Sequence, residues 1–166
     1  MIAEPCKPGT TIGIIGGGQL GRMMCLAAAE LGFRTIVLAP DEDAPAAQVC
    51  NQYMRATYED IDALNTLAGA ADIITYEFEN ISAAALESIS SQLFPPLNAL
   101  RVSQDRLHEK TFMRENGLPV TDFIELTDRD ALAQGLAAFG GSGIVKTRQF
   151  GYDGKGQWRI NAETDW

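Results

Sequence analysis

Thr11-Ile-Gly-Ile-Ile-Gly-Gly-Gly-Gln-Leu-Gly21 is the stretch that decides the fold of this chain of 166 residues. Its apolar first half predicts a short buried strand, and its glycines predict a tight turn into a helix that ends near Leu31. A second strand at 35–38 would complete a strand–helix–strand unit, which favours a right-handed parallel crossover. We expect the helix to bury an apolar face whose residues recur at steps of three and four: Leu20, Met23, Met24, Ala27, Ala28 and Leu31.

The alternation of strand and helix continues in the next part of the chain. Asp72–Tyr76 predicts a third strand, whereas the pattern at 46–55 is ambiguous and predicts a short helical turn. This alternation indicates an α/β fold, a Rossmann-like domain with a doubly wound parallel sheet. Helices are expected at 61–67, at 82–90 with Ser82 as the cap, and at 103–116 with Ser103 as the cap and Gly117 at the end.

A smaller α+β unit is predicted after Leu118-Pro119, where the pattern changes. We expect a first domain at 1–102, a connecting helix at 103–118 and a second domain at 119–166, which is too short to close a large core by itself. The elements expected in the second domain are a strand at 120–126, a helix at 130–139 capped by Thr127, and strands at 144–146 and 157–160.

The composition excludes several classes of protein. The net charge of −9 argues against general binding to nucleic acid or to an anionic membrane. No apolar run is long enough to span a membrane, and the first residues lack the apolar core of a signal peptide, so we expect a cytoplasmic protein. The scattered cysteines Cys6, Cys25 and Cys50 and the single His108 predict neither a disulfide framework nor a zinc site.

Two glycine-rich loops are the main indication of a binding site in this sequence. Gly16-x-Gly18-x-x-Gly21 fits the dinucleotide fingerprint, with Asp41 at the distance of a ribose-binding acid. A helix N-terminus reached through glycines also suits a phosphorylated sugar, and a tight turn without any ligand remains an alternative. The second loop, 151–157, carries Lys155 and follows a strand that ends at Lys146, so its N–H groups and cations suit phosphate. Two such loops favour two phosphorylated ligands.

Four strings in one order give the chain a resemblance to a known family. They are Gly16-Gly-Gly-Gln-Leu-Gly-Arg-Met23, Thr75-Tyr-Glu-Phe-Glu-Asn80, Gln104-Asp-Arg-Leu107 with Lys110, and Ile144-Val-Lys146 followed by Gly151-Tyr-Asp-Gly-Lys-Gly-Gln157. Together they resemble 5-(carboxyamino)imidazole ribonucleotide synthase, an ATP-grasp ligase of purine biosynthesis. The resemblance implies a Rossmann-like pre-ATP-grasp domain with a parallel sheet, then a partial α+β small subdomain of the ATP-grasp fold. It covers about the first half of the family.

The resemblance also implies a reaction and its ligands. ATP would phosphorylate bicarbonate to carboxyphosphate, which carboxylates the amine of aminoimidazole ribonucleotide. Mg²⁺ would be held by residues of the family's later half, so we assign no metal ligand here and expect the chain alone to be inactive. The longer protein would be a homodimer. Plausible alternatives are another ATP-grasp ligase, such as formate-dependent glycinamide ribonucleotide transformylase, and a free-standing regulatory domain that binds NAD or another nucleotide.

Site residues follow by matching motif. Gly18, Gln19 and Leu20 would meet the 5′-phosphate of the substrate, Glu77 its ribose or imidazole, and Tyr152 would position the aminoimidazole. Asp153 and Lys155 are the candidates for catalysis, although many relatives carry arginine in place of Lys155. Strand alternation would point only one of Glu77 and Glu79 into the cleft. The residues expected to contact ATP are Arg106, Lys146, Gly151, Tyr152, Asp153, Gly154, Lys155, Gly156 and Gln157.

Several of these residues also have a plainer interpretation. Glu77 and Glu79 would be solvated charges at a strand end, Lys146 a surface lysine and Asp153 a turn former. Trp158 is expected in the core of the small domain, and His108 is expected to have no special role.

Overall fold

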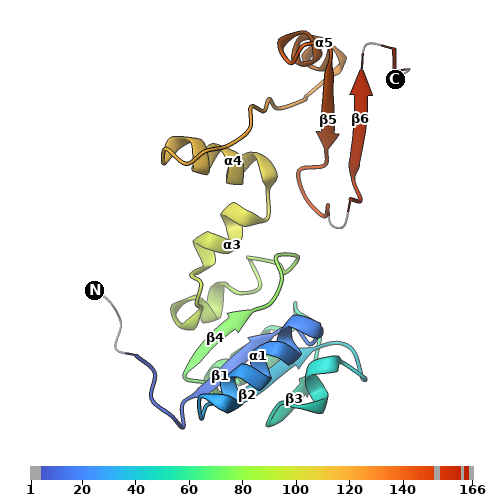
Figure 1. Ribbon diagram of the computed structural model, residues 1–166. Coiled ribbons are helices and arrows are strands. Elements are labelled where there is room, and N and C mark those ends of the chain that lie inside the picture. Colours follow the sequence, from blue (N-terminus) through green and yellow to red (C-terminus); the bar gives the residue numbers. More distant parts are fainter. Residues whose placement is uncertain (1–4, 152–153, 162, 165–166) are drawn as a thin grey trace. The chain divides into compact units, whose positions relative to one another are not determined.

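The computed structural model describes residues 5–151, 154–161 and 163–164 (Figure 1). The chain divides into two compact units, Met1–Arg101 and Val102–Trp166. Among the described residues, no helix is both long and apolar enough to cross a membrane.

The first unit is built on a parallel sheet, as predicted. Its four strands lie in the order β3-β2-β1-β4, with β1 at the centre paired to β2 and β4. Ile74 also makes a single parallel bridge to Leu93 beyond the edge strand. The elements are β1 (Thr11–Ile15), α1 (Gln19–Glu30), β2 (Arg34–Ala39), η1 (Pro45–Gln48), β3 (Gln52–Arg55), α2 (Ile61–Ala70), β4 (Ile73–Tyr76) and η2 (Glu87–Gln92), followed by α3 (Leu97–Ser103).

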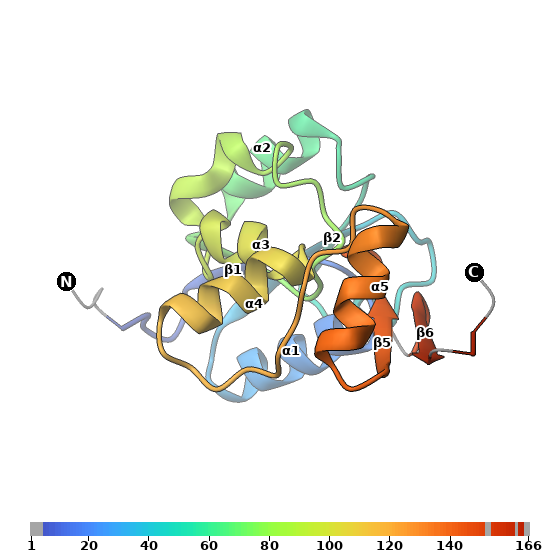
Figure 2. The ribbon, with the colours of Figure 1, turned by 90° about the horizontal axis from the view of Figure 1, so that it is seen from above.

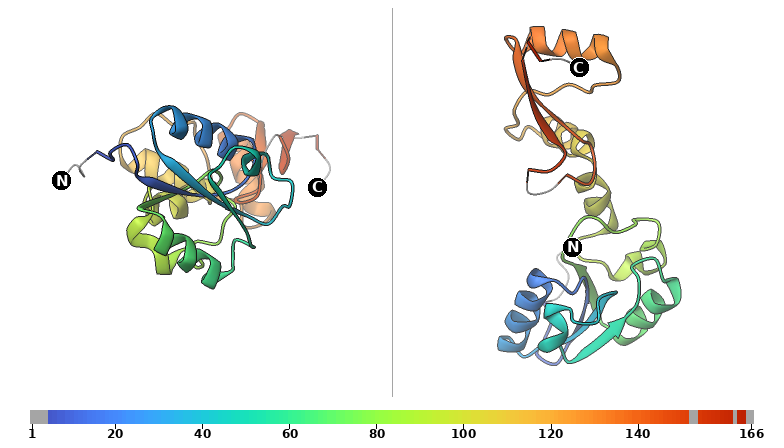
Figure 3. Two further views of the ribbon diagram at one scale, coloured as in Figure 1. Left: turned by 90° about the horizontal axis from the view of Figure 1, so that it is seen from below. Right: turned by 90° about the vertical axis from the view of Figure 1, so that its right-hand side faces the viewer.

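Hydrophobic side chains cover both faces of this sheet because successive residues of a strand point to opposite sides. Ile15 and Leu38 belong to a large cluster with α2, η2 and α3, whereas Ile14 and Val37 pack with Cys25 of α1 and with η1. Figure 2 and the left panel of Figure 3 accordingly show α1 and α2 on opposite faces. The prediction of a doubly wound α/β sheet is therefore confirmed.

The predicted core face of α1 is mostly wrong. Leu20, Met23 and Leu31 are 57%, 56% and 65% exposed, and Ala27 is also exposed. The buried residues of α1 are instead Gly21, Cys25 and Ala28. Only small side chains fit there because the helix approaches the sheet closely: a Cβ on Gly21 would lie 2.6 Å from the carbonyl oxygen of Gly16. The large apolar residues that set the periodicity are therefore displaced to the outer side.

The second unit contains α4 (Arg106–Glu115), α5 (Arg129–Ala138) and an antiparallel hairpin of β5 (Ser142–Lys146) and β6 (Gln157–Asn161). The right panel of Figure 3 shows this hairpin in orange and red beside α5. Ile160 is its buried residue, whereas Trp158 is 55% exposed, so the expectation of a core tryptophan is wrong among the described residues.

Several predicted element boundaries need correction. The helix expected at 103–116 is split, and the N-cap of α4 is Asp105, not Ser103. The strand expected at 120–126 does not form, and the cap of α5 is Asp128, not Thr127. Around Ser82 the chain makes only a turn before η2, and the helical turn at 46–55 is followed by β3, a strand that was missed.

Candidate functional site

Glu77 occupies the first glycine loop. It follows β4 directly, and the parallel pairing of β4 with β1 carries it to the end of β1, where its N–H donates to the carbonyl of Ile15 at 3.1 Å. Its carboxylate accepts a hydrogen bond from the N–H of Gly18 at 2.7 Å and another from the N–H of Gly21. Gly18, the N-cap of α1, has no side chain to supply this bond, so Glu77 caps the helix from a neighbouring strand.

The glycines of the fingerprint make room for this carboxylate. Gly16 has a φ of +116°, which favours glycine, and a Cβ there would lie 2.3 Å from Cγ of Glu77. A Cβ on Gly18 would lie 2.8 Å from Oε1 of the same side chain. The loop therefore holds an anion from its own chain at two N–H groups that a dinucleotide phosphate would otherwise use.

The residues predicted to contact the substrate differ in their surroundings. Glu77 is half-buried and hydrogen-bonded, so the interpretation as a solvated charge is wrong, whereas Glu79 is exposed. Gln19 and Leu20 are exposed at the start of α1. Their contact with a 5′-phosphate stays a prediction, as do the roles of Tyr152 and Asp153, which lie outside the described residues.

Tyr58 offers a probe of the charge on Glu77. Burial is the main cause that raises the pKa of Tyr58 to about 12, and the negative charge of Glu77 adds to it. We expect Glu77→Gln to lower this pKa without restoring the ordinary value of about 10, because burial remains. Titration of the tyrosine rings by NMR measures the shift, and Glu59→Gln is the control, since Glu59 is a weaker cause. An unchanged pKa of Tyr58 in Glu77→Gln would contradict the contribution of Glu77 to it.

A polar pocket of about 120 Å³ lies at the second glycine loop. Its lining includes every described residue that was predicted to contact ATP, brought together from α4, from the end of β5 and from the loop. Thr147 also lines it and was missed by the sequence analysis. The lining residues are Arg106, Lys146, Thr147, Gly151, Gly154, Lys155, Gly156 and Gln157.

The hairpin explains how this loop is closed. Lys146 pairs with Gln157, so the two ends of the loop leave the sheet side by side. The N–H of Thr147 then donates to the carbonyl of Gly156 at 2.8 Å. Gly154 and Gly156 have φ values of +79° and +67°, and a Cβ on Gly156 would lie 2.5 Å from Oγ1 of Thr147. The close approach of these two segments therefore depends on glycine at 156.

We expect Gly156→Ala to destabilise the second unit by about 1–3 kcal/mol more than Gly117→Ala does, the usual penalty of overpacking. Both glycines have φ near +70°, but a Cβ on Gly117 would meet nothing within 4 Å. Both substitutions therefore carry a similar backbone strain, and the difference between their losses of stability measures the clash with Thr147. Urea unfolding followed by tryptophan fluorescence measures it, since both tryptophans, Trp158 and Trp166, belong to this unit. Equal losses would contradict the described approach of Gly156 to Thr147.

The charges at this pocket suit a polyanion. Arg106, Lys146 and Lys155 line a small polar cavity in a chain whose net charge is −9. Cations on flexible stems and loop N–H groups are the donors that phosphate oxygens commonly receive in proteins. The pocket can therefore bind and neutralise a phosphate chain.

A larger groove of about 720 Å³ shares Arg106, Lys146 and Thr147 with the polar pocket. Ile144 lines it from β5 and is 55% exposed; it stands on the same face of the strand as Lys146, two residues on. The groove can receive an apolar ring beside the phosphates. Its other apolar residues come mainly from the segment before α5, from α5 and from β6, and include Phe123, Ile124, Leu126, Leu136, Phe139 and Ile160.

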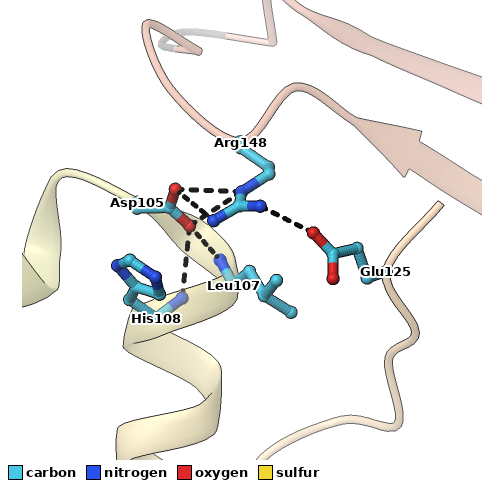
Figure 4. A network of polar contacts seen from close by, with 5 residues as sticks. All are labelled: Asp105, Leu107, His108, Glu125 and Arg148. Atoms are coloured by element: carbon cyan, nitrogen blue, oxygen red, sulfur yellow. Dashed lines mark hydrogen bonds and ion pairs between the residues drawn. The ribbon is translucent and has the colours of Figure 1, made fainter. Parts of the chain in front are cut away.

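A network of charges joins Arg148 to Asp105, the N-cap of α4, and to Glu125 (Figure 4). Arg148 binds Asp105 through Nε, at 2.9 Å from Oδ2, and through Nη2, at 2.7 Å from the same oxygen. Its Nη1 is 2.6 Å from Oε1 of Glu125. The N–H of Arg106 donates to the carbonyl of Arg148 at 2.9 Å. This network was not predicted from the sequence, since its members lie far apart along the chain.

Asp105 stays ionised because of these bonds. Burial by itself raises the pKa of the carboxyl, but hydrogen bonds from Arg148 and from the N–H groups of His108 and Leu107 outweigh burial, and the pKa lies below its ordinary value. Because folding lowers this pKa, the network stabilises the fold above the unfolded-state pKa of about 4. That contribution is lost as the pH falls through the folded pKa.

Comparison with known proteins gives the family of the first unit. The family model described as the ribonucleotide synthetase preATP-grasp domain matches residues 9–104. The chain belongs to this family. An ATP-grasp domain model follows the preATP-grasp domain at residues 111–166.

The relatives of this preATP-grasp chain confirm the resemblance seen in its sequence. It is 50% identical over 156 residues to an N5-carboxyaminoimidazole ribonucleotide synthase of Brucella melitensis, and 46% identical over 166 residues to one of Staphylococcus saprophyticus. These matches cover 93% and 99% of this chain but 43% and 44% of the relatives. The chain thus spans less than half the length of the curated relatives it matches.

Solved structures agree with this similarity. A crystal structure of N5-carboxyaminoimidazole synthetase from Staphylococcus aureus complexed with ADP has a TM-score of 0.89 and 44% identity, covering 95% of this chain and 43% of the other. A synthase from Aspergillus clavatus, in complex with ADP and 5-aminoimidazole ribonucleotide, has a TM-score of 0.76 and 26% identity, covering 93% of this chain and 41% of the other. The preATP-grasp fold and the partial ATP-grasp unit after it therefore match the expected architecture.

Proposed function

We propose that this chain supplies the phosphate-binding loop and part of the substrate site of an N5-carboxyaminoimidazole ribonucleotide synthase. In this function ATP phosphorylates bicarbonate to carboxyphosphate, which carboxylates the amine of aminoimidazole ribonucleotide in purine biosynthesis. The observation that carries the proposal is the polar pocket, which gathers every described residue predicted for ATP. The longer protein works as a homodimer, and the division into 1–102, 103–118 and 119–166 belongs to the same proposal.

The second unit holds the nucleotide in this proposal. Lys146 and Arg106 bind the phosphate chain, and the N–H groups of 154–157 cover it. Ile144 offers an exposed apolar surface for the adenine ring in the adjoining groove. Lys155 keeps positive charge near the transferred phosphoryl group, where charge develops during the reaction. A lysine gives a point charge there and lacks the two-pronged contact of an arginine.

The first unit contacts the acceptor substrate. Glu77 already binds the N–H groups of Gly18 and Gly21, so we assign the substrate contact to the exposed Gln19 and Leu20 and to the outer edge of the Glu77 carboxylate. Tyr152 and Asp153 position the aminoimidazole and its amine, with Asp153 able to accept a proton. These assignments rest on matching motifs and on the exposure of the residues at the start of α1.

Mg²⁺ supplies charge neutralisation in phosphoryl transfer of this kind. Among the described residues, no group of three or more His, Cys, Asp or Glu side chains gathers. We therefore name no ligand in this chain and derive no step through the metal.

Calorimetry on the purified chain tests the proposal. ADP and aminoimidazole ribonucleotide are titrated separately, with NAD as the comparison ligand. We expect ADP to bind with measurable heat and to be displaced by tripolyphosphate. NAD should not bind, because Glu77 holds the N–H groups that a dinucleotide needs. Binding of NAD with no binding of ADP would overturn the proposal and favour the regulatory domain. The chain alone is expected to show no ATP hydrolysis, and measurable turnover would contradict that expectation.

A further inference from the structure

Arg148 lies two residues after Lys146, yet the two cations have different surroundings. Lys146 lines the polar pocket, whereas Arg148 does not. The guanidinium of Arg148 binds two carboxylates, Asp105 and Glu125 (Figure 4). Its charge is thus neutralised within the chain, which distinguishes Arg148 from the cations that line the polar pocket.

Asp105 makes the stronger half of this network. Its side chain is 9% exposed, whereas that of Glu125 is 45% exposed. Oδ1 of Asp105 also accepts from the N–H groups of Leu107 at 2.9 Å and His108 at 3.2 Å, so the same carboxylate caps α4. A buried carboxylate that binds a guanidinium through two nitrogens holds its partner more rigidly than an exposed pair does.

Both ends of the ion pair adjoin residues of the polar pocket. Arg106 follows Asp105 in sequence, and Thr147 precedes Arg148. A backbone hydrogen bond joins the same two segments, from the N–H of Arg106 to the carbonyl of Arg148. Arg106 and Thr147 are therefore held by a side-chain bond and a backbone bond between the same two segments. We call this arrangement of Asp105, Arg106 and Arg148 the clamp.

We propose that Asp105 and Arg148 are positioning residues that fix Arg106 and the start of the glycine loop for the phosphate chain of a nucleotide. The clamp joins the N-terminus of α4 to the loop, so that phosphate binding and the intact clamp stabilise each other. This inference rests on the proposed function, since it requires the polar pocket to bind nucleotide phosphates.

Variants of the clamp test the proposal by two measurements on the same chain. Calorimetry gives the Kd for ADP, and hydrogen exchange gives the protection of the Thr147 amide, which donates to Gly156. Arg148→Met removes the ion pair. Arg148→Lys keeps the positive charge but loses the contact of two guanidinium nitrogens with one carboxylate. Asp105→Asn removes the negative charge but keeps an oxygen that can cap α4. Glu125→Gln is the matched control because it removes only the exposed partner.

We expect Arg148→Met and Asp105→Asn each to raise the Kd for ADP by about tenfold, which is about 1.4 kcal/mol. The double variant should lose little more than either single one, because both act through one contact. Exchange at Thr147 should quicken while exchange in α5 is unchanged, Arg148→Lys should recover part of the affinity, and Glu125→Gln should change the Kd less than twofold.

Two results would overturn the proposal. One is a Kd for ADP within twofold of wild type in Arg148→Met. The other is faster exchange throughout the second unit, which would indicate a merely structural role. If the wild-type chain does not bind ADP, the proposed function fails, and exchange at Thr147 still decides whether the clamp positions the loop: unchanged protection in Arg148→Met overturns it, and a local increase supports it.

Discussion

Gly16→Ala should lower the free energy of unfolding of the first unit by about 3 kcal/mol or more. The φ of +116° is unfavourable for alanine, and the new Cβ would lie 2.3 Å from Cγ of Glu77. Glu77 must then leave the turn, and each hydrogen bond to a charged group contributes about 1.5–3 kcal/mol. Hydrogen exchange at the amides of β1, measured across a urea series, gives the free energy.

Gly9→Ala is the matched control for this substitution. Gly9 also has a positive φ, of +95°, but a Cβ there would meet nothing within 4 Å. Gly9→Ala therefore introduces backbone strain without displacing any side chain, and we expect the free energy of unfolding to fall by about 1–2 kcal/mol. If Gly9→Ala and Gly16→Ala cost the same, the close packing of Glu77 in the turn is not what makes Gly16 necessary.

Lys146→Met should raise the Kd for ADP by about 30-fold, which corresponds to about 2 kcal/mol. Lys146 stands at the last position of β5 and lines the polar pocket, and methionine keeps most of its length while removing the charge. A charge-assisted hydrogen bond to phosphate is the interaction that disappears. Calorimetry measures the Kd, and the unfolding curve should hardly change because Lys146 is exposed.

Lys7→Met controls for the change in net charge. Lys7 is exposed in the first unit and does not line the polar pocket, yet its replacement alters the net charge of the chain by the same amount. We expect its Kd for ADP to stay within twofold of wild type. Equal weakening in the two variants would mean that the overall field of the protein, and not a contact at Lys146, governs nucleotide binding.

Local sequence patterns were sufficient for the framework of the fold. Apolar β-branched runs predicted β1, β2 and β4, and the glycines predicted the turn into α1 and the loop between β5 and β6. The residues that depend on distant partners were not predictable in this way. Asp105 caps α4 because Arg148, far along the chain, holds its carboxylate in place, whereas Ser103 looked the better cap when only neighbours were considered.

The exposed and buried faces of α1 also could not be predicted from periodicity, because they depend on how closely the helix packs. The spacing of Leu20, Met23 and Leu31 fits a helix face, but it does not reveal how closely that helix approaches the sheet. Because Gly21 sits against Gly16, the inner face takes small residues, and the larger side chains are exposed. The segment at 120–126, Val-Thr-Asp-Phe-Ile-Glu-Leu, pairs with no strand among the described residues and is therefore not a strand itself.

The capping of α1 by Glu77 bears on how glycine fingerprints are interpreted in other proteins. A G-x-G-x-x-G turn signals a surplus of N–H groups at the start of a helix, and it leaves open whether a ligand or the protein neutralises them. An acidic residue one position beyond the adjacent parallel strand would mark the second case. Genome surveys that require this acid to be absent should assign fewer chains of this kind to dinucleotide enzymes.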